Sequence, residues 1–116
     1  MLQSIIHYSL HFAFPIVLAK IFFRENWLKG YLIMLLTMLI DLDHLLANPI
    51  FDANRCSIGF HPLHKNYFFI VYLILCYFPK TRALGLGLVL HLITDTIDCI
   101  WMKGNLDVFK SWIPFL

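Results

Sequence analysis

The sequence has little charge for its length. Of its 116 residues, 14% are charged and 60% are apolar, whereas a soluble domain has about 25% charged and about 45 to 50% apolar residues. This composition disfavours a soluble fold and intrinsic disorder, and three cysteines are too few for a secreted disulfide scaffold. Lysine and arginine are scattered, giving a net charge of +2 without a dense basic stripe, so we expect no nucleic-acid partner.

The apolar residues fall into four runs, each close to the length of about 20 residues that crosses a bilayer. We expect transmembrane helices over residues 2–23, 30–47, 62–78 and 83–101. Short turns make the first two helices, and the last two, antiparallel neighbours. Residues 48–61 predict a long polar loop, and residues 105–116 an interfacial C-terminal segment. The sequence therefore predicts a single all-α domain over residues 1–116, an integral membrane four-helix bundle.

Basic residues predict the orientation of this bundle. The two short turns and their flanks hold five of the nine basic residues: Lys20, Arg24, Lys29, Lys80 and Arg82. The positive-inside rule then places both termini and the long loop outside the cytoplasm. Trp27 and Tyr31 fit interfacial anchors at the cytoplasmic level.

Histidine and aspartate cluster inside the apolar runs. The clusters are His7 and His11; Asp41, Asp43 and His44 in DLDH; His61 and His64 in HPLH; and His91, Asp95 and Asp98. Residues three and four apart share a helix face, although Asp43 falls about 160° from Asp41 in an α-helix. A carboxylate in a transmembrane helix costs roughly 2.5 to 3.5 kcal/mol on insertion scales. The sequence therefore predicts that another interaction offsets the cost of placing these carboxylates in the membrane.

The antiparallel connectivity brings all the clusters into one leaflet. Imidazoles and carboxylates that converge in a low-dielectric interior predict a divalent metal site, of zinc type or with manganese or iron. The absence of a CxxC pair argues against a thiolate site. Ten candidate ligands exceed the needs of one tetrahedral ion, so we expect two ions, with the remaining residues orienting ligands or taking up protons. The predicted ligands are His7, His11, Asp41, Asp43, His44, His61, His64, His91 and Asp95.

Two further features bear on this site. Pro15 has no amide to bond to the carbonyl of His11, which predicts a kink or a free acceptor beside that ligand. Cys56 and Cys99 fall on the same predicted side of the membrane. Our hypothesis is a disulfide between them that pins the loop over the site, with two free thiols as the alternative.

An N-terminal histidine helix, DLDH at the end of the second run, HPLH after the polar loop and HxxxD in the last run resemble a family of predicted bacterial membrane-bound, metal-dependent hydrolases. The resemblance extends from His7 to Asp98 and is greatest to a small branch common in Bacteroidetes, with a distant likeness to zinc-dependent phospholipase C. It implies a bacterial inner membrane location, where the positive-inside rule predicts the site on the periplasmic side. It also implies Asp41 or Asp43, His61 or His64, and the His91 and Asp95 pair as leading ligands. The later histidine and glutamate ligands of the soluble phospholipases are missing, which argues against a three-ion site.

We therefore expect an enzyme that cleaves a phosphoester of a lipid or lipid-linked compound, an amphiphile that enters from the membrane. Asp43 or Asp98 would accept a proton from water, and Arg55 would clamp the phosphate. One alternative is a transporter or small subunit of a larger membrane complex, in which the clusters relay protons or metal ions. A relay needs polar groups through both leaflets, and the inner leaflet has almost none. A haem-binding bundle is a second alternative, which clustered aspartates disfavour. The sequence leaves open whether the protein forms a homo-oligomer.

Overall fold

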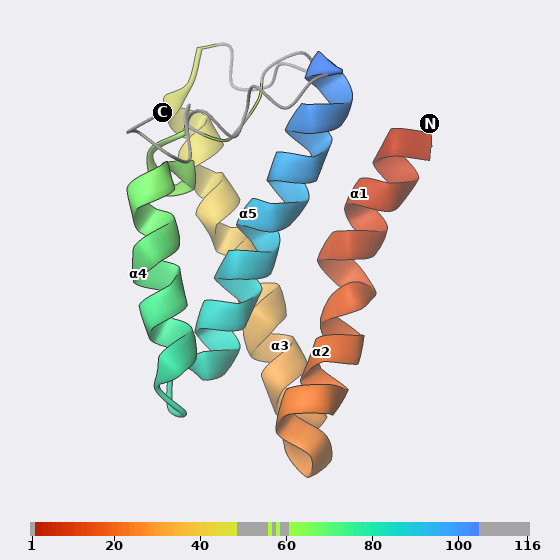
Figure 1. The fold of residues 1–116 in the computed structure, drawn as a ribbon, viewed down its shortest axis with the longest axis vertical. Helices are drawn as coiled ribbons and strands as arrows, with labels where there is room; N and C mark the ends of the chain where they lie inside the picture. Colours follow the sequence, from red (N-terminus) through yellow and green to blue (C-terminus); the bar gives the residue numbers. More distant parts are fainter. Residues whose placement is uncertain (1, 49–55, 57, 59–60, 105–116) are drawn as a thin grey trace.

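The computed structural model describes residues 2–48, 56, 58 and 61–104 (Figure 1). These residues form helices joined by turns and short connections, and no strand occurs among them. The expected all-α class is therefore confirmed. The predicted polar loop lies mostly outside the described residues, and the predicted interfacial segment lies wholly outside them.

The predicted first helix is present as two helices, α1 (Leu2–Phe12) and α2 (Phe14–Phe23). They are separated at Ala13, where the amide of Ile16 bonds to the carbonyl of Ala13 over 3.1 Å and not to the carbonyl of Phe12. Pro15 follows this break in the first turn of α2, where a residue without an amide donor is tolerated. The predicted disturbance beside His11 is therefore present.

The break in the first helix has a partner across the bundle. The hydroxyl of Tyr31 donates a hydrogen bond of 2.8 Å to the carbonyl of Phe12, the acceptor that the break leaves without its helical partner. This bond joins α1 to α3 (Trp27–Leu36). Tyr31 was expected at the membrane interface, and the structure shows this additional role.

The chain reverses through η1 (Arg24–Asn26) and then forms α3 and η2 (Thr37–Leu46). An α-helix was expected over residues 30–47, but η2 is a 3₁₀ helix of ten residues. Residues i and i+3 eclipse in a 3₁₀ helix. Asp41 and His44 therefore lie on one face of η2, and Asp43 lies about 120° from Asp41, given three residues per turn.

The predicted third helix is also divided. Pro62 begins a short 3₁₀ turn, η3 (Pro62–His64), and the extended backbone of Lys65 separates η3 from α4 (Asn66–Tyr77). The hydroxyl of Tyr72 on α4 donates a hydrogen bond of 3.0 Å to the carbonyl of Leu63. This bond fixes the turn that carries the HPLH motif.

The last helix, α5 (Arg82–Lys103), lies at the centre of the bundle and contacts α1, α2, α3, η2 and α4 (Figure 1). One apolar cluster packs it against α4, and another, which includes Ala19, Met34 and Leu90, packs it against α2 and α3. A Cβ on Gly87 would lie 2.7 Å from the side chain of Thr37 and 2.9 Å from Cα of Met34. Glycine here therefore permits the close approach of α5 to α3 and η2.

The beginning of α1, the end of η2, η3 and the end of α5 lie at the same end of the bundle (Figure 1). A disulfide joins Cys56 to Cys99 near the end of α5, which confirms the hypothesis of a bridge between the loop and the last helix. Two helical stretches are long and apolar enough to cross a membrane, Leu2–Leu46 and Arg82–Met102, while Tyr67–Tyr77 is a shorter apolar helix.

Candidate metal centre

Four side chains from three elements form a central group: Asp41 on η2, His64 on η3, and His91 and Asp95 on α5. Nε2 of His91 lies 3.1 Å from Oδ1 of Asp41 and 3.3 Å from Oδ2 of Asp95. Nε2 of His64 lies 3.3 Å from Oδ1 of Asp41 and 3.1 Å from Oδ2 of Asp95. The two Nε2 atoms are 3.2 Å apart, so five of the six distances among these four atoms fall between 3.1 and 3.3 Å.

These spacings match a tetrahedral cation site. Ligands about 2.0 Å from a zinc ion are about 3.3 Å from one another in a tetrahedron. An imidazole nitrogen carries at most one proton and donates one hydrogen bond, yet each Nε2 here lies within 3.3 Å of three other ligand atoms. Oδ2 of Asp95 is buried and makes no hydrogen bond in this arrangement. One cation among the four atoms would contact all of them at once, whereas each Nε2 proton serves a single acceptor.

Asp43 lies behind His64. Its Oδ2 accepts hydrogen bonds from Nδ1 of His64 over 3.0 Å and from the amide of Leu63 over 2.9 Å. A carboxylate that bonds to one ring nitrogen leaves the other for a metal and fixes the orientation of the ring, a common arrangement around metal-binding histidines. Asp43 was expected as a ligand or as the base, and these contacts favour a positioning role.

A second group consists of His7 and His11 on α1 with Asp95 on α5. Oδ1 of Asp95 lies 3.5 Å from Nε2 of His11, while the other oxygen belongs to the central group. Nδ1 of His7 and Nε2 of His11 are buried and have no hydrogen-bond partner. The two groups therefore share Asp95, one oxygen each.

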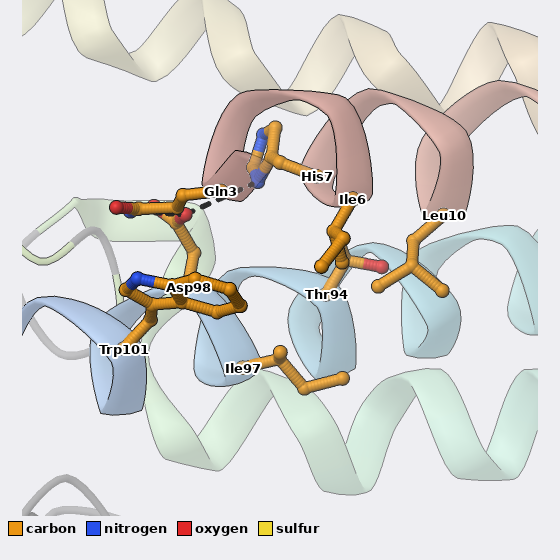
Figure 2. Close-up of a pocket in the computed structure, with 8 residues that line it drawn as sticks. All are labelled: Gln3, Ile6, His7, Leu10, Thr94, Ile97, Asp98 and Trp101. Carbon is orange, nitrogen blue, oxygen red and sulfur yellow. Dashed lines mark hydrogen bonds and ion pairs between the residues drawn. The ribbon is translucent and has the colours of Figure 1, made fainter. Parts of the chain in front are cut away.

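Asp98 lies at the edge of this second group. Its Oδ1 is 3.8 Å from Nδ1 of His7 and accepts a hydrogen bond of 2.6 Å from the side-chain Nε2 of Gln3. Figure 2 shows these three side chains at a pocket between α1 and α5, together with Trp101. Asp98, which was predicted to accept a proton, therefore lines an opening between the two helices.

A third group, Asp43, His44 and His61, could also hold an ion. Nδ1 of His44 lies 3.2 Å from Oδ1 of Asp43, and the rings of His44 and His61 stack with centroids 3.7 Å apart. The structure thus places every predicted ligand in one of three adjacent groups. Arg55, predicted to clamp phosphate, lies outside the described residues.

The carboxylates of the site are paired with imidazoles alone. Within the described residues, the ion pairs of Asp41, Asp43 and Asp95 all involve histidines, which are charged only when protonated. Asp43 and Asp95 are only 6% exposed. Because burying uncompensated carboxylates is costly, a bound cation would stabilise this cluster strongly.

Two residues near the site were not predicted from the sequence to act there. Gln3 bonds to Asp98, and its position four residues before His7 places it on the same face of α1, a signal that could have identified it. Tyr31 bonds to the backbone of α1 next to His11. Nothing in the spacing indicates that contact, because it joins separate helices.

Comparison with protein families places residues 1–102 in a family of unknown function, DUF6122. The match covers most of the chain, so the protein belongs to this family. No curated protein and no solved structure matches the chain.

Proposed function

We propose that this protein is an integral membrane metal-dependent hydrolase that cleaves a phosphoester of a lipid or lipid-linked compound. The observation that carries the proposal is the central group, whose ligand atoms have the spacing of a tetrahedral site. Imidazole and carboxylate ligands suit zinc, and also manganese or iron. The resemblance to bacterial membrane-bound hydrolases supports the reaction class.

The distribution of apolar surface supports a bundle of four membrane crossings. The stretch Leu2–Leu46 is apolar, yet only 17% of its most apolar window is buried, unlike the core helix of a soluble protein. Exposed apolar surface on this scale requires lipid or a partner. This stretch reverses direction at η1 (Figure 1) and so supplies two crossings, to which η3 with α4, and α5, add two.

The basic turns and the disulfide support a proposed orientation and location. The positive-inside rule places the short turns in the cytoplasm. The disulfide between Cys56 and Cys99 lies at the opposite end, beside the metal centre, and disulfides persist in the bacterial periplasm. Both features support a multi-pass protein of the bacterial inner membrane with its site on the periplasmic side.

The residues of the central group, and Asp98 near it, would each have a role in this hydrolysis. A divalent cation supplies Lewis acidity, which lowers the pKa of water and neutralises charge on phosphoryl oxygens. Asp41, His64, His91 and Asp95 would hold it, and Asp43 would orient His64. In the hydrolysis, the water oxygen forms a bond to phosphorus as the bond from phosphorus to the leaving alcohol oxygen breaks. Asp98 accepts one proton of the water, and the leaving oxygen takes a proton from solvent.

Elemental analysis of detergent-purified protein tests the proposal. We expect stoichiometric divalent metal in the wild type and a lower metal content in His91→Ala and Asp95→Ala. The exposed Ile93 lies on the same helix, and Ile93→Ala is the matched control that keeps the metal. Hydrolysis of chromogenic and lipid phosphoesters should follow metal content across these proteins. A metal-free wild type, or variants that keep all their metal, would contradict the metal site. Metal-loaded protein that cleaves none of these phosphoesters would contradict the reaction class.

A further inference from the structure

We infer that His7, His11 and Asp95 hold a second cation, whose free coordination position opens onto the pocket between α1 and α5, and that the phosphoester binds there. This inference rests on the proposed hydrolase function and assigns its substrate to one of the two ions. The central ion then has a supporting role.

Asp95 connects the two positions. Its Oδ2 lies 3.1 Å from His64 and 3.3 Å from His91, whereas its Oδ1 lies 3.5 Å from His11. A carboxylate that directs its two oxygens at two ligand groups is suited to bridging two cations. Two-metal hydrolytic sites hold their ions about 3.5–4 Å apart, a separation that one carboxylate can span.

The buried nitrogens of α1 need a partner. The side chain of His11 is 2% exposed, and its Nε2 has no hydrogen-bond partner, as is also true of Nδ1 of His7. A buried polar atom without a partner destabilises the folded state. A cation between these rings and Oδ1 of Asp95 removes that cost for both.

The two groups differ in the number of ligands. The central group offers four protein ligands, enough to close a tetrahedral ion, whereas the second group offers three. Four protein ligands fill a tetrahedral ion, which must expand its coordination before it can bind a substrate, whereas sites with three protein ligands leave a position for water or substrate. The second group is therefore the one where substrate can bind.

The pocket supplies the access that such a position needs. It is lined by His7 of the second group and by no residue of the central group. Gln3 and Asp98 form its polar side, and Ile6, Ile97 and Trp101 are among its apolar residues (Figure 2). Polar groups beside apolar walls, between two membrane helices, suit the phosphate of an amphiphile that arrives from the lipid.

Metal counting separates the two positions. We expect two equivalents of Co²⁺ in the reconstituted wild type, and one equivalent in both His7→Ala and His11→Ala. Ser9→Ala on the exposed face of α1 is the matched control, with two equivalents. Circular dichroism identifies a variant that fails to fold. If His11→Ala fails to fold, His7→Ala is the test, because His7 is partly exposed. Two equivalents that survive both histidine changes would overturn the inference.

Inorganic phosphate tests the open position. Its ³¹P resonance should broaden with the Co²⁺-loaded wild type but not with His11→Ala, although that variant keeps the central ion. Ile97→Trp narrows the pocket and should weaken phosphate binding at least tenfold with two equivalents retained. Ile93→Trp, at a similarly exposed position of α5 outside the pocket, should leave phosphate binding unchanged. Equal behaviour of the two tryptophan variants, or no broadening with the wild type, would overturn the inference.

The two proposals fail in different ways. A wild type that holds no cation contradicts the proposed function itself. A wild type that holds one cation, retained in His11→Ala, leaves the proposed hydrolase with its central ion and rejects the second position.

Discussion

Oδ2 of Asp43 lies 3.0 Å from Nδ1 of His64, so Nε2 of the same ring faces the other ligands of the central group. The bond selects which nitrogen of His64 is available to a metal and holds the ring in place. Asp43 thus influences the centre without being one of its four closest ligands.

Asp43→Asn should weaken metal binding about 10- to 100-fold, the usual effect of changing the partner of a metal-binding histidine. The amide keeps a similar shape but lacks the charge that makes His64 a stronger ligand. Competition with a chelator measures the affinity. Asn48→Asp, at an exposed position after η2, adds a carboxylate nearby and should leave the affinity unchanged. An unchanged affinity in Asp43→Asn would show that the bond does not tune the site.

Removal of the metal should destabilise the folded protein, because the cluster then buries carboxylates that only histidine protons can neutralise. A ligand that binds the folded state at 100 times its Kd stabilises it by about 2.7 kcal/mol. Thermal unfolding in detergent, with and without EDTA, measures this difference, and we expect a lower Tm with EDTA. Asp95→Ala should show no such response. A wild-type Tm that is indifferent to EDTA would contradict the prediction.

Gly87→Val should lower the stability by about 1–3 kcal/mol, the usual range for an overpacked contact. The new side chain would press on Thr37 and on the backbone of Met34, and so move η2 away from α5. Because Asp41 and His91 belong to these two elements, metal affinity should fall as well. Leu84→Val, at an exposed position of α5, is the control for both measurements. A stable variant with normal affinity would mean that the helices can separate without disturbing the centre.

Reduction of the Cys56 to Cys99 disulfide should lower stability by about 2–4 kcal/mol, since the bridge restricts the unfolded chain. Mass mapping without reductant should find these two cysteines linked and Cys76 free to react with an alkylating reagent. Cys56→Ser should reproduce the loss of stability, while Cys76→Ser should not. Two alkylatable thiols at positions 56 and 99 in native protein would reject the bridge.

The spacing of the histidines and aspartates predicted much of the candidate site. Pairs three or four residues apart share a helix face, and antiparallel runs return to the same end of a bundle. These two facts were enough to expect that His11, His91 and Asp95 would meet. The all-α class followed from the apolar runs in the same way.

The distinct contacts of Asp41 and Asp43 were not predictable. In an α-helix they would lie almost opposite one another, but η2 is a 3₁₀ helix, and a hydrophobic pattern does not distinguish the two forms over so short a stretch. The contacts that separate their roles join η2 to η3, across a loop whose path the sequence does not specify. The hydrogen bond from Tyr31 to Phe12 was also not predictable, because it depends on how two helices pack against each other.

The side chains of the central group come from positions between Asp41 and Asp95, and those of the second group from positions between His7 and Asp95. During synthesis, no growing chain can assemble either group until α5, which carries His91 and Asp95, has been made and has packed against α1 and η2. Any cation would therefore bind late in biogenesis, and a chain that ends before α5 would lack Asp95 and with it both groups.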